Sequence, residues 1–547
     1  MKIERILIED QMAPIGLDEK KPAFSWLLTA EEGEQNLMQS ACRIVVHTGE
    51  DTVWDSGKME TGVSTGIGYE GEALQPCTKY EVKAEVWDNH GGKAEAESSF
   101  ETGLMDSLYA AWEGAEWIGA PHATVCAENR GVFTIESEFR MEGGKGEAGI
   151  VFGANDFRLN DHTKNELGME GENYIRYAVC LEDGDARLEI YRVGYAPEDT
   201  AEKPFAVTKL VNWKEKTQEI LTPENADAFH KLTVEVDGNV AYAYVDGILV
   251  DAIEEHGFFG TKVSGRQLNP RGNNDVLPYP RLNEIGFYAG KGTTGYFKNL
   301  TVRNVRKPSA EIVRETPEGR LDGGKSIFAD QIPVENGYFK VEDSQITADP
   351  SHHSIPMLRS CISCQKEKKL ASARLYITAR GIYDCRINGQ EITEDLLRPG
   401  LTQYDHRMNY QTYDITGLMK PGRNGIGVTL ASGWWSEAQT FVVKNFNYFG
   451  DKESLLAKVV MKYEDGSREV FGTNTEDWKY FGEGPYLFSS YFAGEQYDAR
   501  RAEVYETYSL PEFDDSTWEK PVVVDTVMIE EFCTMPGFGR SWPAGPG

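Results

Sequence analysis

Short alternations of apolar and polar residues dominate the chain, and long helical periodicity is nearly absent. In the run YEVKAEVW at 80–87 every even position is apolar, and the polar run DNHGG at 88–92 then turns the chain. Runs 231–236 and 373–379 repeat the alternation. Because successive side chains of a strand point to opposite faces, this pattern predicts strands buried on one side. The sequence therefore predicts an all-β chain of tandem sandwiches.

The alternating segments fall into three units separated by breaks in the pattern. We expect a first sandwich at 1–108 and a second at 112–305. Pro308, Pro317 and a Gly pair at 323–324 predict a linker at 306–325. A third sandwich at 326–526 follows. The tail 527–547 has no compact pattern and is interpreted as the start of a linker toward another domain.

Two of the units resemble known sandwich types. In the first, Tyr80 followed by apolar positions 82, 84 and 86 resembles the tyrosine corner of fibronectin-type domains, whose hydroxyl bonds backbone just upstream. A buried core tyrosine without the corner is the alternative. The strand order of the second unit resembles the lectin-like jelly rolls of carbohydrate-binding modules. Two long polar insertions, 156–174 and 259–282, interrupt it, and long loops on a rigid sandwich often hold binding sites.

Net charge and cysteine content limit the expected binding partners and the expected cellular compartment. The 547 residues include 56 Lys and Arg against 88 Asp and Glu, a formal charge of −32. Such a surface repels phosphate backbones and anionic lipid, so neither nucleic acid nor a membrane is an expected partner. The eight cysteines are dispersed, and Cys361 and Cys364 form the only CxxC. With no signal peptide at the start, we expect reduced thiols and a cytoplasmic protein.

A series of motifs in the third unit resembles a known family. The series runs through 373–383, 387–390, 399–404, 410–416, 432–435 and 494–500. It is similar to the N-terminal β-sandwich of bacterial α-L-rhamnosidases, inverting glycoside hydrolases that remove terminal rhamnose. KPAFSW at 21–26 and WDSG at 54–57 resemble the leading sandwich of the same family.

The resemblance implies where the chemistry lies. In that family both catalytic carboxylates belong to a barrel of paired helices that follows the sandwiches, and nothing after residue 526 has helical periodicity. No catalytic residue is therefore expected here, and the chain alone should be inactive. Glu495 and Asp498 form an acidic pair within a family-like motif. Their neighbour Arg500 favours a charge-paired turn over an acid–base pair.

The second unit contains candidate sugar and calcium ligands. Asn155 and Asp156 begin its first insertion, and Asn273 and Pro278 lie in the last. Calcium-dependent rhamnose-binding modules of some rhamnosidases use Asp, Asn and a loop carbonyl, and Ca²⁺ prefers such oxygen ligands. Tyr191 and Tyr195 are candidates for stacking on a sugar ring. The alternative is that these polar residues only cap turns.

Trp434 and Trp435 are the candidate docking residues of the third unit. If the pair lies on a strand, one ring fills the core and the other faces outward. With the aromatic run 446–449 it would form an exposed patch, near the active-site mouth by family resemblance. Such a patch would bind substrate or dock on the catalytic domain. The alternative is that the core and a neighbouring loop share both rings.

Together these observations predict the N-terminal, non-catalytic portion of an α-L-rhamnosidase. Its expected partners are rhamnose-containing glycans or glycosides and a C-terminal helical catalytic domain. A free-standing carbohydrate-binding protein and a purely structural multi-sandwich scaffold are the alternatives.

Overall fold

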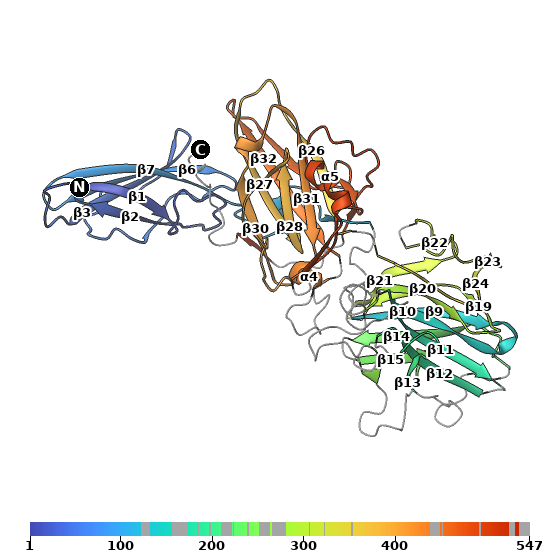
Figure 1. The fold of residues 1–547 in the computed structure, drawn as a ribbon. Coiled ribbons are helices and arrows are strands. Elements are labelled where there is room, and N and C mark those ends of the chain that lie inside the picture. Colours follow the sequence, from blue (N-terminus) through green and yellow to red (C-terminus); the bar gives the residue numbers. More distant parts are fainter. Residues whose placement is uncertain are drawn as a thin grey trace.

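The structure, a computed structural model, shows three β-sandwiches in a row (Figure 1). In space the third sandwich lies between the other two, with the first at one end and the middle sandwich of the sequence at the other. The all-β prediction is confirmed. The described residues are 1–121, 132–155, 173–182, 185–195, 199–208, 221–222, 224–237, 240–250, 263–264, 268, 281–305, 307–321, 323–351, 354–437, 449–450, 452–491, 494–524 and 531–534.

The first sandwich packs a three-stranded sheet, in the order β1-β2-β5, on a four-stranded sheet, in the order β4-β3-β6-β7. Its strands are β1 (Lys2–Ile8), β2 (Ala23–Thr29), β3 (Gln39–Thr48), β4 (Asp51–Asp55), β5 (Ile67–Gly68), β6 (Lys79–Asp88) and β7 (Lys93–Glu101). Tyr80 on β6 is buried, and its hydroxyl accepts the Gln75 backbone N–H at 2.7 Å. The tyrosine corner is therefore confirmed.

The middle sandwich forms its core between two antiparallel sheets. One has six strands in the order β13-β12-β11-β10-β18-β25, and the other is built on β16-β15-β14-β9-β19-β24-β23. Its elements are β9 (Val132–Met141), η3 (Glu142–Gly144), β10 (Gly146–Ala154), β11 (Tyr174–Glu182), β12 (Asp185–Val193), β13 (Phe205–Thr208), β14 (His230–Asp237), β15 (Val240–Val245), β16 (Ile248–Leu249), β17 (Val263–Ser264), β18 (Glu284–Ala289), β19 (Thr294–Phe297), β20 (Leu300–Asn304), β21 (Lys307–Thr316), β22 (Gly319–Arg320), β23 (Val334–Glu335), β24 (Tyr338–Glu342) and β25 (Gln345–Ala348).

The third sandwich packs a five-stranded sheet, β29-β28-β31-β26-β34, on a second sheet, β37-β8-β32-β27-β30-β38, with β33 beside β32. After η1 (Tyr109–Trp112), its elements are β8 (Ile118–Gly119), β26 (Met357–Cys364), β27 (Leu370–Arg380), β28 (Ile382–Ile387), β29 (Gln390–Glu391), β30 (Arg407–Asp414), η6 (Thr416–Leu418), β31 (Gly422–Ala431), α4 (Gly433–Ser436), β32 (Ser454–Tyr463), β33 (Arg468–Gly472), β34 (Lys479–Phe481), β35 (Tyr486–Ser490), β36 (Gly494–Tyr497), η7 (Ala499–Arg501), α5 (Ala502–Thr507), β37 (Val522–Val523) and β38 (Glu531–Thr534).

The strand pairing corrects three of the expected boundaries. Residues 306–325 are not a linker, because β21 pairs with β20 and β22 with β21 inside the middle sandwich. That sandwich continues to Ala348, since β24 and β25 pair with β19 and β18. At the other end of the chain, β38 adds a parallel strand to β30, so residues 531–534 belong to the third sandwich.

The position of β8 shows that the middle sandwich is an insertion. Ile118, expected in the second unit, pairs with Leu455 of β32 and with Val523 of β37. The chain thus begins the third sandwich, leaves to build the middle one, and returns at β26. Pattern alone could not reveal this, because a two-residue strand is too short to show alternation.

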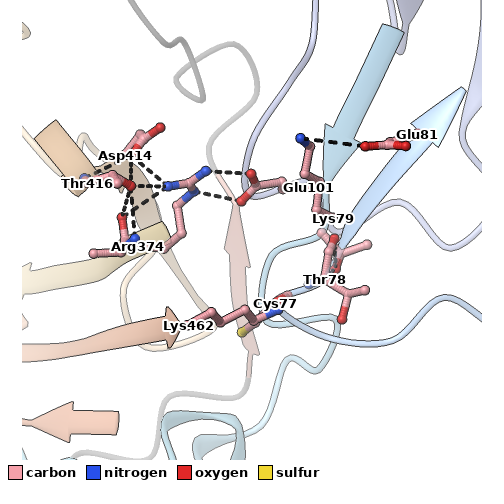
Figure 2. Close-up of polar contacts among 11 residues, drawn as sticks. Cys77, Thr78, Lys79, Glu81, Glu101, Arg374, Asp414, Thr416 and Lys462 are labelled. Atoms are coloured by element: carbon pink, nitrogen blue, oxygen red, sulfur yellow. Dashed lines mark hydrogen bonds and ion pairs between the residues drawn. The ribbon is translucent and has the colours of Figure 1, made fainter. Parts of the chain in front are cut away.

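Partly buried polar contacts join the first and third sandwiches (Figure 2). Arg374 of β27 donates to both carboxylate oxygens of Glu101, at 2.5 and 2.6 Å, and to Asp414 at 2.6 Å. Lys462 of β32 donates to the Cys77 carbonyl oxygen at 2.6 Å. Nearby, Tyr410 donates to an oxygen of Asp18 at 2.6 Å. We call this contact region the joint.

The joint extends along the connecting segment after β7. Lys458 donates to the Ala111 carbonyl oxygen at 2.6 Å and to Glu113 at 2.8 Å, and Arg468 also pairs with Glu113. Trp112 and Trp117 are buried in one apolar cluster with side chains of β27, β30 and β32. The two sandwiches therefore share a core as well as ion pairs. Among the described residues, no helix is long and apolar enough to cross a membrane.

Candidate functional site

The outer face of the six-stranded sheet of the middle sandwich gathers aromatic and charged side chains. Strand alternation directs Ile175 and Tyr177 of β11 into the core and Arg176 outward. Arg176 pairs in register with Tyr191 of β12. Its guanidinium carbon lies 4.7 Å from the Tyr191 ring centroid and 3.9 Å from that of Tyr288 on β18. Cation–π contacts thus hold the Arg176 side chain between two phenols.

Carboxylates complete this outer face. Tyr288 donates to Glu147 at 3.2 Å, and Tyr191 donates to Glu189 at 2.8 Å. Burial raises the pKa of Glu147, while the nearby Arg176 charge opposes that rise. Burial, together with Glu189, raises the pKa of Tyr191 to about 12. Both phenols therefore keep their protons at neutral pH. The face offers donors and acceptors beside aromatic edges, the combination that polar small-molecule sites use.

The two predicted stacking tyrosines have different environments. Tyr191 is half-buried on the outer face, and Arg176 lies over its ring. Tyr195 is buried in the core, where its hydroxyl donates to the Gly153 carbonyl oxygen at 2.6 Å. The prediction that Tyr195 stacks on a sugar is therefore wrong. Tyr195 lies two residues beyond the end of β12, where the chain turns back toward the core.

Only part of the predicted calcium site can be placed. Asn155 is exposed, has a positive φ of 50°, and donates through its amide nitrogen to Glu284 at 2.8 Å. Asp156, Asn273 and Pro278 lie outside the described residues. Within the described ranges, no group of three or more His, Cys, Asp or Glu side chains could hold a metal ion. The calcium site stays a prediction.

Trp434 and Trp435 lie on α4, a single helical turn, and not on a strand as expected. Trp435 is 3% exposed and packs among Tyr404, Phe449 and the Arg380 guanidinium. Trp434 is half-buried and lies against the Tyr491 ring, with centroids 4.4 Å apart. Phe449 is itself buried, and residues 446–448 lie outside the described ranges. One ring is thus buried and the other partly exposed, as expected. The cause is a helical turn and not the alternation of a strand.

Asp498 lies in a charge-paired turn, as the sequence favoured, whereas Glu495 lies on strand β36. Asp498 caps η7 by accepting the Arg500 backbone N–H at 3.1 Å, and it pairs with the Arg500 side chain at 2.7 Å. The Arg500 hydrogen bond lowers the pKa of Asp498 to about 2. A carboxyl group that is this acidic stays ionised at neutral pH and cannot serve as a general acid.

Sequence reasoning missed Arg176 and Tyr288 on the outer face. Their signal was available, because alternation in the runs 174–182 and 284–289 places both on the side opposite the core residues. What alternation cannot supply is the register between strands far apart in the chain. The pairing of β10 with both β11 and β18 is what brings the two side chains together.

Comparisons with known proteins identify two of the three sandwiches. A family model described as the α-L-rhamnosidase N-terminal domain matches residues 368–534. A second, described as the Rha78A-like N-terminal immunoglobulin domain, matches residues 3–106. These ranges fall in the third and first sandwiches.

Similar proteins agree with the family models. An α-L-rhamnosidase of Streptomyces avermitilis is 27% identical over 523 residues, which are 93% of this chain and 44% of that protein. One from Formosa agariphila is 37% identical over 152 residues, 27% of this chain and 16% of that protein. The chain thus spans less than half the length of these relatives.

The fold also has a solved counterpart. A crystal structure of the Streptomyces avermitilis α-L-rhamnosidase complexed with L-rhamnose aligns with 97% of this chain. The aligned part is 46% of the crystallised chain. Its TM-score is 0.54 at 20% identity, a likeness of fold. The first and third sandwiches thus match, in order, two domain models of α-L-rhamnosidases, and most of the chain is similar to the N-terminal region of such enzymes.

Proposed function

We propose that this chain is the non-catalytic N-terminal portion of an enzyme that hydrolyses terminal α-L-rhamnose from glycosides or polysaccharides. The observation that supports it is the ordered pair of family domains, within an alignment of 93% of the chain to one α-L-rhamnosidase. The catalytic carboxylates would lie in a helical domain outside these residues. Residues 1–547 should then leave 4-nitrophenyl α-L-rhamnoside uncleaved. Turnover that a point mutation within 1–547 abolishes would contradict the proposal.

The length of the natural reading frame separates this proposal from its rival. A continuation with long helical periodicity supports the enzyme portion, whereas a stop codon at residue 548 would favour a free-standing carbohydrate-binding or structural protein. We also place the protein in the reducing cytoplasm. The six described cysteines, Cys42, Cys77, Cys180, Cys361, Cys364 and Cys385, are free thiols, which supports that placement.

In this proposal the middle sandwich binds rhamnose-containing glycans with the help of calcium. The support is the outer face around Arg176, Tyr191 and Tyr288, together with the oxygen-rich positions Asn155, Asp156, Asn273 and Pro278. At Asn155 the side-chain oxygen would coordinate, since its nitrogen donates to Glu284. Calcium affinity should be that of extracellular modules, about 10⁻⁴–10⁻³ M.

Titration calorimetry of L-rhamnose into residues 1–547, with calcium and with a chelator, tests this role. We expect heat of binding that depends on calcium, and the loss of this calcium-dependent heat in Asp156→Ala. The matched control Asp330→Ala, an exposed aspartate elsewhere on the same sandwich, should bind as the wild type does. No calcium-dependent heat and an unchanged melting temperature would leave only a structural role.

The third sandwich would dock on the catalytic domain through Trp434. Its half-buried ring against Tyr491 supports this, because a partner could cover it without unfolding α4. In the enzyme extended by its natural sequence, Trp434→Ala should weaken substrate binding or docking while the isolated sandwiches still melt normally. Trp435→Ala should mainly destabilise, since that ring is buried. Unchanged kinetics in a folded Trp434→Ala enzyme would contradict docking.

A further inference from the structure

A cavity of about 460 Å³ opens on the outer face of the five-stranded sheet of the third sandwich. Its floor comes from β28 and β31, where Ile382, Asp384 and Ala431 point away from the core. Tyr491 and Tyr505 line its walls. The volume lies within the range of pockets that hold small molecules, about 300–1,000 Å³.

Two of the acidic side chains that line the cavity are neutralised by the protein. Asp384 accepts from Arg398 and from the Tyr505 hydroxyl, both at 2.9 Å. Glu391 pairs with Arg386 at 2.8 Å. These carboxylates shape the cavity and leave little charge for a ligand to balance.

Three further carboxylates around the cavity have no such partner. Glu394, Asp395 and Glu495 line it, and among the described residues none of them forms an ion pair. Glu495 accepts only a hydrogen bond from Ser489, at 3.3 Å. These groups are hydrogen-bond acceptors that remain available to something entering the cavity.

Arg398, which is buried, adds hydrogen-bond donors to a cavity whose carboxylates are acceptors. The side chain is 5% exposed and lines the cavity. Its Nη2 binds Asp384, but its Nε and Nη1 are buried without a hydrogen-bond partner in the described structure. Buried donors are rarely left unsatisfied, because losing water without a replacement costs free energy. An acceptor that reaches these nitrogens from the cavity would satisfy them.

A ligand for this cavity must satisfy donors and acceptors together. An organic cation would pair with the carboxylates but could not accept from Arg398, and an anion would meet three unpaired carboxylates. A neutral molecule with several hydroxyl groups does both, since each hydroxyl donates and accepts. Exposed Leu396 and Leu397, at 80% and 50%, add an apolar rim for its C–H surface.

We propose that this cavity is a saccharide-binding site of the third sandwich, independent of calcium. It is separate from the outer face of the middle sandwich, so it does not rest on the sugar-binding role proposed there. Glu394, Asp395 and Glu495 accept from ligand hydroxyls, Arg398 donates to a ligand oxygen, and the tyrosine rings pack on the ligand.

The test titrates neutral sugars, L-rhamnose, D-xylose and D-galactose, into residues 1–547 in the presence of a chelator. Saturation-transfer NMR and calorimetry report binding. Glu394→Gln, an exposed position, should weaken it roughly tenfold, the cost of one charge-assisted hydrogen bond. Ala431→Phe should abolish it by filling the floor. The matched control Glu367→Gln, exposed at the far end of the same sheet, should bind normally.

Each outcome decides the proposal. Chelator-resistant binding that falls in Glu394→Gln and not in Glu367→Gln supports it. Absence of binding by all three sugars, or binding unaffected by Glu394→Gln, overturns it. Binding of tetramethylammonium in place of sugars also overturns it. If Ala431→Phe loses the wild-type melting profile, Glu394→Gln still decides. Binding that calcium restores and Asp156→Ala removes belongs to the middle sandwich and leaves this cavity without a ligand.

Discussion

The first and middle sandwiches are attached to the third in opposite ways. The first shares an apolar cluster with it and adds the joint of Arg374, Lys462, Tyr410 and Lys458. Among the described residues, no strand of the middle sandwich pairs with a strand of either neighbour. It is connected through the chain after β8 and the chain before β26. Figure 1 shows the same separation.

This difference assigns different mechanical roles to the two attachments. A shared core with partly buried ion pairs fixes the orientation of the first sandwich, because any rotation would break several contacts together. Because no such pairing holds it among the described residues, we expect the middle sandwich, the candidate glycan-binding module, to reorient more easily than the first. A binding module benefits from such freedom, since it can reach glycan chains of varied geometry while the joint holds a rigid base.

The largest expected effect is at Arg374. Arg374→Ala leaves the partly buried Glu101 and the 36% exposed Asp414 without their shared cation. Removing one partner of a fully buried pair costs about 3–5 kcal/mol, and solvent screening lowers the expected loss at this partly exposed pair below that range. Urea unfolding should show this loss, and trypsin should separate the first sandwich faster. As a control, Lys369→Ala removes one partner of an exposed ion pair with Glu464. Because Lys369 is 77% exposed, this change should cost about 0–1 kcal/mol. Equal losses in both variants would mean that Arg374 contributes no more to stability than an exposed ion pair does.

Two buried hydroxyls allow the attachments to be compared directly. Tyr410→Phe removes the acceptor of the Leu104 N–H and should cost about 1–3 kcal/mol. Tyr195→Phe removes a similar buried bond inside the middle sandwich. In scanning calorimetry we expect two transitions, with Tyr410→Phe lowering one and Tyr195→Phe the other. A single transition shifted by both variants would show that all three sandwiches unfold as one unit.

The smallest effect concerns acid. The Arg468 hydrogen bond, with Lys458, lowers the pKa of Glu113 from 4.5 to about 2. A depressed carboxyl pKa stabilises the folded state above pH 4.5, and that stability is lost as pH falls toward 2. The melting temperature of the transition that reports the joint should therefore fall as pH is lowered from 4.5 toward 2. In Glu113→Gln the melting temperature should fall less over the same range. Partial exposure of Glu113 screens the effect. Identical pH profiles would exclude this ion pair as the cause.

The alternation of apolar and polar residues predicted the strands and the sandwich class well, because a strand buried on one face has an apolar side chain at every second position. Tyr80 and its corner followed from one local motif. The insertion of the middle sandwich did not, since it depends on which distant segments pair with Ile118. Trp434 and Trp435 show the same limit: four residues of helix between two strands leave no periodic signal.

The candidate sites show the same difference between local patterns, which a sequence displays, and contacts between distant segments, which it does not. Both tyrosines were candidates by residue type alone, and the structure places Tyr191 on the outer face of β12 and Tyr195 in the core just beyond that strand. The cavity beside Arg398 was not predicted at all. It is assembled from β28, β31, the loop 392–398 and the hairpin of β35 and β36, which no single stretch of sequence displays together.

The early position of β8 also dictates an order of events during synthesis. Ile118 pairs with Leu455, so at about 5–20 residues per second β8 leaves the ribosome roughly 20–70 s before its partner strand. Until then the cluster around Trp112 and Trp117 lacks Leu456 and Val460 of β32, and the first and middle sandwiches must fold on either side of an unfinished third. Nascent chains halted before residue 455 should therefore present those two indoles to chaperones, and chains halted after β38 should not.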